Sequence, residues 1–380
     1  MVRDPGHAYE DRPASTGEAG TMGYDDTGVR CTMLRGGTSR GLYFEARDLP
    51  ADDAERDDLL LRLMGTPDPR QIDGLGGATS LTSKVAVVWP SEHPEVDVDY
   101  LFLQLGVDQP TVSDRQNCGN ILAGVGPFAV ERGLVPAGPE ETAVAIRMVN
   151  SDSIAVATFP TPGGRVEYRG QIEIAGVPGT AAPVVLDFAD TEGSATGGLL
   201  PTGRVRDSID GVDVTCVDNG MPVVLAMAES LGLTGYESHE ELAADAQLLA
   251  RIDALRTKAG DLMGMGDVRS SSVPKTALLA APRDGGQVCT RSFIPVQPHS
   301  SVGVLAAVSI VTGMLLPGSV GHELTRDWPE GTTRVDVEHP TGHLLVDVAV
   351  DPVADPPRVL RSGVVRTARK LFDGLAFPRA

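Results

Sequence analysis

Two long apolar runs stand out in the hydrophobic pattern, and each follows a short polar stretch. The first run, 121–134, follows Asn117-Cys118-Gly119-Asn120, and the second, 302–316, follows Pro298-His299-Ser300-Ser301. Each has the length of a helix. The pattern therefore predicts one apolar helix in each half of the chain, with small polar residues at its start.

Shorter apolar and alternating segments predict many strands and two further helical regions. Residues 29–44 predict a strand, a glycine-rich turn and a second strand. Helices are expected at 52–64 and over roughly 238–262, where Leu and Ala recur at helical spacing. The other expected strands are 85–89, 97–107, 142–148, 154–159, 166–174, 184–188, 212–217, 223–227, 276–280, 291–294, 333–338, 344–350 and 359–366.

The length of 380 residues suits two domains of ordinary size. Residues 1–28 are polar and lack periodicity, which predicts a disordered extension. Residues 189–203 are rich in Gly, Thr and Ser and form the linker candidate. We therefore expect an N-terminal domain at 29–200 and a C-terminal domain at 201–380.

Composition narrows the classes of function. The net charge of −20 disfavours nucleic-acid and acidic-membrane surfaces, which need a basic footprint. No apolar run reaches membrane-spanning length and no signal-peptide core is visible, so a cytoplasmic protein is expected. The four cysteines form no CxxC or Cys/His cluster, and therefore no metal site is predicted.

The two halves share an order of features that indicates a duplicated unit. Gly36-Gly37 precedes an apolar strand, as Asn219-Gly220 does in the second half. Ser83-Lys84 and Pro274-Lys275 each open a further apolar strand, and Cys118 and His299 each stand before an apolar helix. We infer strands wrapped on one central helix in each half. The two helix starts are expected to meet in a cleft between the domains.

A helix start carries free amide groups that attract an anion and favour a thiolate. Cys118 is thus the candidate acid/base, although a small buried cysteine that packs a helix start is the alternative. Lys84 is an equally balanced candidate for a base or for a carboxylate partner, because a desolvated lysine can lose its proton.

Further residues are candidates for holding substrate carboxylates. Arg35 and Ser39 stand in the turn Arg35-Gly36-Gly37-Thr38-Ser39-Arg40-Gly41, whose alternative is a plain hairpin turn. His299 could cap the helix or donate to the substrate. Lys275 could be the structural counterpart of Lys84 or a cation that binds the substrate. Met221 could pack in the core or contact the substrate. The remaining binding candidates are Asn117, Gly119, Asn120, Arg291, Ser300 and Ser301.

These motifs, together with Gly74-Leu75-Gly76-Gly77 and Asp218-Asn219-Gly220-Met221-Pro222, resemble the PrpF-like methylaconitate isomerase family. The resemblance runs from about residue 29 to the end. It implies an α+β, diaminopimelate epimerase-like fold with two pseudo-repeated domains, each a β-barrel-like sheet around a central helix. Residues 68–74 and 121–128 are most similar to the branch of 4-oxalomesaconate tautomerases.

The resemblance implies a cofactor-independent 1,3-proton shift on an unsaturated di- or tricarboxylate such as 4-oxalomesaconate. It matches the family's catalytic lysine and cysteine to Lys84 and Cys118. His299 stands where diaminopimelate epimerase has a second cysteine, which disfavours racemisation by a thiol pair.

The alternatives are a 2-methylaconitate or aconitate isomerase and a non-catalytic carboxylate-binding protein. The expected partner is a small polycarboxylate, with no cofactor, nucleic acid or membrane. The oligomeric state stays open, with a homodimer as one option.

Overall fold

The computed structural model describes residues 28–380, so the prediction for the N-terminal extension lies, apart from Gly28, outside the described residues. The chain forms two compact units. The first comprises the chain up to Pro136, Ile146–Asp152 and Ala368–Ala380, and the second comprises Ala137–Ala145 and Ser153–Thr367. The sequence-based domain boundary at 200 stays a prediction.

One ring of hydrogen-bonded strands runs β1-β2-β3-β4-β6-β7-β8-β16 and closes because β16 also pairs with β1. Its helix α3 is buried along its whole middle, from Ile121 to Ala129, as a central helix must be. The bounds are β1 (Val29–Gly36), β2 (Ser39–Glu45), α2 (Asp53–Met64), β3 (Lys84–Pro90), β4 (Val98–Leu105), β5 (Val112–Ser113), α3 (Gly119–Glu131), β6 (Glu141–Met148), β7 (Ser153–Pro160), β8 (Pro183–Phe188) and β16 (Arg358–Ala376).

A second run of strands continues β16-β15-β14-β13-β12-β11-β10-β9, and no pairing within residues 28–380 closes it. Its helix α6 is likewise buried from Ala306 to Met314 and packs against β10, β11 and β15. The bounds are β9 (Asp207–Ile209), β10 (Val212–Asp218), β11 (Pro222–Met227), α4 (His239–Ala244), α5 (Ala246–Leu262), β12 (Lys275–Ala280), β13 (Val288–Phe293), α6 (Val304–Leu315), β14 (Arg334–His339) and β15 (Gly342–Asp351). Short 3-10 helices are η2 (Ala46–Asp48), η3 (Pro162–Gly164), η4 (Ala228–Leu231) and η5 (His322–Thr325).

The two strand sets repeat one pairing pattern, which confirms the predicted duplication. In the first set β1–β2 is antiparallel, β2–β3 parallel, β3–β4 antiparallel and β4–β6 parallel. In the second set β10–β11, β11–β12, β12–β13 and β13–β14 follow the same order. Lys84 and Lys275 each begin the strand that pairs in parallel.

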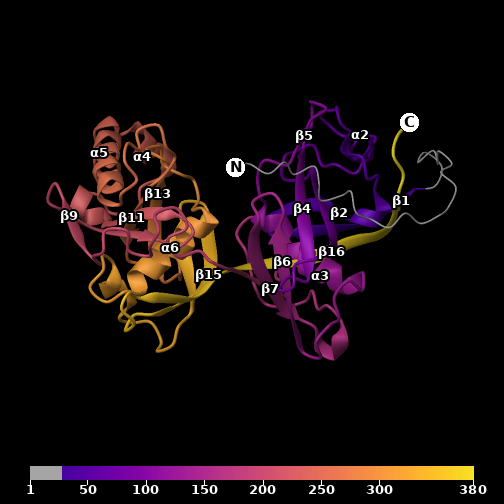
Figure 1. Ribbon diagram of the computed structural model, residues 1–380. Helices are drawn as coiled ribbons and strands as arrows, with labels where there is room; N and C mark the ends of the chain where they lie inside the picture. The colour runs from indigo at the N-terminus through magenta and orange to yellow at the C-terminus, as the bar shows by residue number, and fades with distance from the viewer. Residues whose placement is uncertain (1–27) are drawn as a thin grey trace. The chain divides into compact units, whose positions relative to one another are not determined.

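Figure 1 shows α2 beside the strands of the first set, and α4 and α5 beside those of the second. Leu59, Leu60 and Leu63 of α2 belong to one buried cluster with side chains of β2, β3 and β4. Leu248 and Ile252 of α5 belong to the matching cluster on β10, β11 and β12. Successive strand residues alternate between faces. The remaining inner-face side chains are therefore left to pack on α3 or α6.

Two expectations about strands need correction. Residues 166–174 form no strand, and only an isolated bridge joins Ile172 to Ala181. The chain folds back here: the Ala182 amide donates to the Tyr168 carbonyl, and Gly170 packs against the backbone of Ala182. The last strand, expected at 359–366, extends to Ala376 because its second part pairs with β1. That partner lies more than 300 residues away in sequence, so the local hydrophobic pattern could not predict this part of the strand.

Candidate functional site

Lys84 is buried at the first residue of β3, with 7% of its surface exposed. Its Nζ donates to Gln104 Oε1 at 2.5 Å and lies 5.0 Å from the centre of the Phe102 ring. The Gln104 amide nitrogen donates in turn to the carbonyls of Ser80, Ser83 and Leu105, which fixes the oxygen toward Lys84. The amine is thus held by a neutral acceptor and an aromatic face, not by a carboxylate.

The loop before β3 is organised by Gln71, which is almost fully buried. Its Oε1 accepts hydrogen bonds from the Ala78 amide and from the Ser83 hydroxyl, and its Nε2 donates to Thr66. Gly76 passes so close that an added Cβ would lie 2.1 Å from Gln71 Oε1. This packing sets the position at which the chain enters β3 at Lys84.

Cys118 is the N-cap residue of α3 and makes no side-chain capping bond. No acidic residue occupies the first turn of the helix, so its free amides and its dipole are available to an anion. Among the four cysteines, Cys118 alone is partly exposed. Burial raises the pKa of Cys31 and of Cys216 to about 12 and also raises that of Cys289. Their thiols are therefore inert, and Cys118 is the one thiol accessible to a substrate.

Glycines bring the turn between β1 and β2 and the start of β3 against the first turn of α3. A Cβ at Gly36 would lie 2.2 Å from the Asn120 carbonyl oxygen, and one at Gly37 2.1 Å from Asn120 Oδ1. A Cβ at Gly41 would lie 2.7 Å from the Lys84 carbonyl oxygen and 3.1 Å from Ile121 Cδ1. Gly41 thus lies between the backbone of Lys84 at the start of β3 and the Ile121 side chain at the start of α3.

The other binding candidates of the first unit surround this helix start. Arg35 Nη1 donates to the Gly37 carbonyl, and burial together with the charge of Arg369 lowers the pKa of Arg35. The Ser39 hydroxyl is buried without a hydrogen-bond partner in the described residues, so it can serve a substrate oxygen. Asn117 donates to the Ser151 hydroxyl, and Asn120 donates to Thr38. Gly119 has open space around its Cα.

Tyr100 is a residue that pattern reasoning missed. It lies on the same face of β4 as Phe102 and Gln104, because strand residues two apart share a face. Its hydroxyl is buried with no hydrogen-bond partner in residues 28–380. Burial raises the pKa of Tyr100 well above its usual value, and the nearby Cys118 thiol raises it further. The sequence around Tyr100 is an ordinary apolar strand, and it does not indicate that the tyrosine lies near Cys118.

The second unit has its own cluster at the start of α6. Gly303 is the N-cap, with no side-chain capping bond and no acidic residue in the first turn. Lys275 Nζ lies 3.5 Å from the position of a Cβ on Gly303. Among the described residues the Lys275 amine has no hydrogen-bond or ion-pair partner, and burial lowers its pKa. An unpartnered, half-buried cation beside free helix amides is suited to an anion from outside the protein.

The loop before α6 is held by its own side chains. The Ser301 amide donates to His299 Nδ1 at 2.9 Å, and the His299 amide donates to the Ser292 carbonyl at 2.7 Å. His299 Nδ1 thus accepts a hydrogen bond within its own loop, and its roles as a cap or a substrate donor stay predictions. The Ser300 side chain is exposed. Ser301 Oγ lies 3.2 Å from Nε2 of His339, a residue that was not a candidate.

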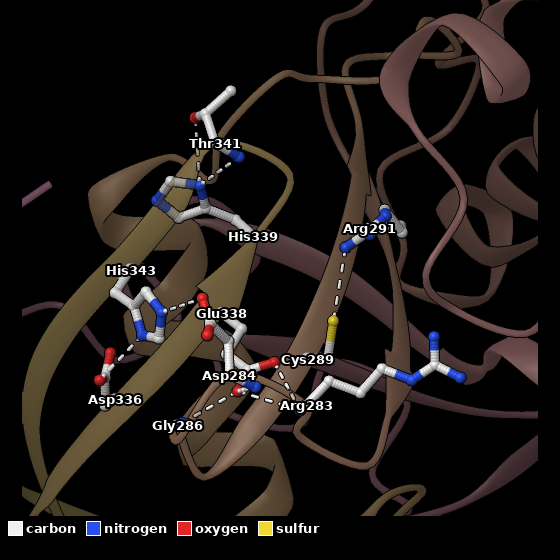
Figure 2. Close-up of polar contacts among 10 residues, drawn as sticks. All are labelled: Arg283, Asp284, Gly286, Cys289, Arg291, Asp336, Glu338, His339, Thr341 and His343. Atoms are coloured by element: carbon white, nitrogen blue, oxygen red, sulfur yellow. Dashed lines mark hydrogen bonds and ion pairs between the residues drawn. The ribbon is translucent and has the colours of Figure 1, made fainter. Parts of the chain in front are cut away.

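Met221 and Arg291 are also placed in the second unit. The Met221 carbonyl accepts from the Ser309 hydroxyl of α6, which ties the turn after β10 to that helix. Arg291 is 7% exposed, and it donates to the carbonyls of Glu237 and Thr290. Figure 2 shows its guanidinium directed toward Cys289, whose sulfur accepts from Nη1 at 3.4 Å. These contacts anchor the side chain, and the substrate role of Arg291 stays a prediction.

Within residues 28–380, no group of three or more His, Cys, Asp or Glu side chains is arranged to hold a metal ion. In the same range, the helices are too short or too polar to cross a membrane.

Comparison with known proteins supports a single family. The family model described as PrpF protein matches residues 27–378. The (4E)-oxalomesaconate Delta-isomerase of Novosphingobium sp. (strain KA1) is 56% identical over 91% of this chain and 96% of its own length. The 4-oxalomesaconate tautomerase of Pseudomonas putida is 53% identical over 92% of this chain and 96% of its own length.

A solved structure supports the fold. The crystal structure of methylitaconate-delta-isomerase is similar with a TM-score of 0.83 and 34% identity, covering 93% of this chain and 96% of that chain. The α+β architecture expected from the sequence is thereby confirmed. Because the family model spans nearly all of the described residues, and because these similar proteins are isomerases, the chain belongs to the PrpF protein family and is an isomerase.

Proposed function

We propose that this isomerase catalyses a 1,3-proton shift on a tricarboxylate of the 4-oxalomesaconate type, with Cys118 and Lys84 as the proton-transfer groups. The substrate class is supported by the relatives named for oxalomesaconate, which are 56% and 53% identical over nearly their full lengths. The observation that carries the residue assignment is the thiol of Cys118. It is partly exposed at an uncapped helix start, while the other three thiols are buried.

The chemistry divides into two proton transfers. One of Cys118 and Lys84, in its basic form, removes a proton from the carbon next to the double bond or the keto group. The electron pair of that C–H bond moves into the conjugated system, and negative charge develops on an oxygen. The other group then delivers a proton at the far carbon. Atoms and charge balance, because one proton is taken and one is returned.

The surroundings of the first cluster fit this charge movement. The free amides at the start of α3 can stabilise the developing enolate oxygen, and no acidic residue in the first turn opposes it. Lys84 is held by Gln104 and Phe102, and it has no ion-pair partner within residues 28–380. Arg35 and the unpartnered hydroxyl of Ser39 are proposed to bind a substrate carboxylate.

In the second cluster we propose that Lys275, Ser301 and the amides at the start of α6 bind a carboxylate group. Lys275 has no described partner, and burial of its charge is unfavourable unless an anion is bound. The helix start adds amide donors without a competing acidic side chain.

Proton NMR in heavy water tests the proposal. The wild-type protein should convert 4-oxalomesaconate between its isomers and incorporate solvent deuterium. The Cys118→Ala variant should lose roughly a hundredfold or more in rate, the usual cost of a missing acid/base. Cys216→Ala is the matched control, because its thiol is fully buried in the core and its loss should change stability but not rate.

Three outcomes would count against parts of the proposal. A native rate for Cys118→Ala removes that residue from the chemistry. Faster turnover of 2-methylaconitate than of 4-oxalomesaconate changes the substrate. Binding of the tricarboxylate with no deuterium exchange would indicate a binding protein on the same scaffold.

A further inference from the structure

His339 is the last residue of β14 and is separated by about 40 residues from the loop that begins α6. Its Nε2 lies 3.2 Å from Ser301 Oγ. The turn that follows β14 is tied to the same loop, because the Thr341 hydroxyl donates to the Ser300 carbonyl at 2.9 Å. Figure 2 shows the His339 ring together with Thr341, whose amide and hydroxyl face Nδ1.

The hydrogen bonds determine which ring nitrogen carries the proton. A backbone amide can only donate, and the Thr341 amide contacts His339 Nδ1 at 3.3 Å. Nδ1 therefore accepts, and in a neutral ring the proton must be on Nε2. Nε2 then donates to Ser301 Oγ, which leaves the hydroxyl proton of Ser301 free to be donated elsewhere.

The ring also stays neutral at physiological pH. Burial lowers the pKa of His339 to about 4, and the charges of His343, His299 and Arg291 act in the same direction and outweigh a hydrogen bond with the His343 backbone that raises it. A neutral ring is what the Thr341 contact requires, since a protonated Nδ1 could not accept it. The Ser301 amide does not compete for His339, because it already donates a hydrogen bond to His299 Nδ1.

We propose that His339 is a positioning residue that holds the Ser301 hydroxyl as a donor to a carboxylate at the start of α6. The proposal rests on the proposed function, in which Ser301 and Lys275 bind a carboxylate. His339 itself touches no substrate atom in this scheme. Its effect passes entirely through Ser301, and it should therefore act on binding and leave the proton-transfer step nearly unchanged.

A double-mutant cycle on 4-oxalomesaconate kinetics tests this dependence. His339→Leu should raise KM about tenfold, with kcat within about threefold of wild type, as expected for one hydrogen bond to a charged group. In the Ser301→Ala background the same substitution should have no further effect. His339→Gln keeps an N–H donor and should recover most of the wild-type KM. Equal effects of His339→Leu in both backgrounds would overturn the proposal, as would a fall in kcat with unchanged KM.

A spectroscopic measurement separates this proposal from the proposed function. Nitrogen-15 NMR of the histidine rings in the unliganded wild-type protein at pH 7 should show His339 protonated on Nε2 and not on Nδ1. His339→Gln identifies the resonances. A proton on Nδ1 would overturn the positioning role whether or not the protein is active. If the tautomer is as expected but wild type does not isomerise 4-oxalomesaconate, the failure belongs to the proposed function.

Discussion

The starts of α3 and α6 occupy equivalent places in the two strand sets, yet their lysines are held differently. The Lys84 amine donates to Gln104 and lies over Phe102, whereas the Lys275 amine has no hydrogen-bond or ion-pair partner among residues 28–380. The first helix start carries a partly exposed thiol, and the second has a glycine as its N-cap. A duplicated scaffold thus offers two helix starts without a side-chain cap, and only the first has a thiol at its N-cap.

The largest expected effect comes from Lys84→Met. Removing an acid/base group should lower kcat by roughly a hundredfold or more. Methionine keeps most of the apolar stem against Phe102, so the fold should persist. Rates from the heavy-water assay, with circular dichroism for folding, measure the result. A KM increase at constant kcat would instead make Lys84 a carboxylate partner, like the role proposed for Lys275.

Lys275→Met should act on KM, by about tenfold or more for a lost charge-assisted contact. It should also stabilise the unliganded protein at pH 7. Burial lowers the pKa of Lys275 in the folded protein, so the unfolded chain binds the proton more tightly. The charged lysine therefore reduces the stability of the fold at pH values below the ordinary pKa of lysine. Urea unfolding measures this gain. Lys258→Met is the control, because Lys258 is exposed and paired with Asp210; a destabilised Lys275→Met would argue against an unpartnered cation.

Two glycines, each packed against the first turn of one central helix, are expected to differ less in their effect on stability. Gly37 and Gly220 both have positive φ, so alanine at either should cost about 1–2 kcal/mol. At Gly37 the new Cβ would also lie 2.1 Å from Asn120 Oδ1, whereas at Gly220 the nearest contact is Leu305 at 3.3 Å. Gly37→Ala should therefore be less stable than Gly220→Ala by about 1 kcal/mol, the cost of a disturbed hydrogen bond. Chemical denaturation compares the two, and equal losses would mean that Asn120 moves aside freely.

The last contrast is the pH dependence of stability near β14. The pKa of His339 is lowered to about 4 from 6.5, so its contribution to stability is present above pH 6.5 and is lost as the pH falls toward 4. His339→Gln should flatten that decline in urea unfolding.

His343 provides a control of opposite sign. Burial opposes its charge, but Asp284 and Asp336 outweigh burial and raise its pKa. Its contribution is therefore present below pH 6.5 and is lost as the pH rises through the raised pKa. An unchanged decline in His339→Gln, or a flattened decline in His343→Gln, would contradict the assignment.

Local pattern was sufficient for the helices and for most strands. The run after Cys118 and the run after Ser301 contain almost no charge, and both became buried central helices, α3 and α6. The alternation at 166–174 was misleading, because contacts with Ala181 and Ala182 fold that stretch into turns. The strand pairing of β16 with β1 was also invisible locally, since it joins opposite ends of the chain.

The sequence by itself determined the duplicated α+β architecture, the family and the two helix starts, because these depend on periodicity and on short motifs. Only the tertiary structure decided how the side chains at those starts are held. Two contacts join separate elements: Lys84 with Gln104, and His339 with Ser301. Two other groups are buried by neighbouring elements without a side-chain partner: the Lys275 amine and the Tyr100 hydroxyl. Strand register and packing create such neighbours, and no local pattern encodes them.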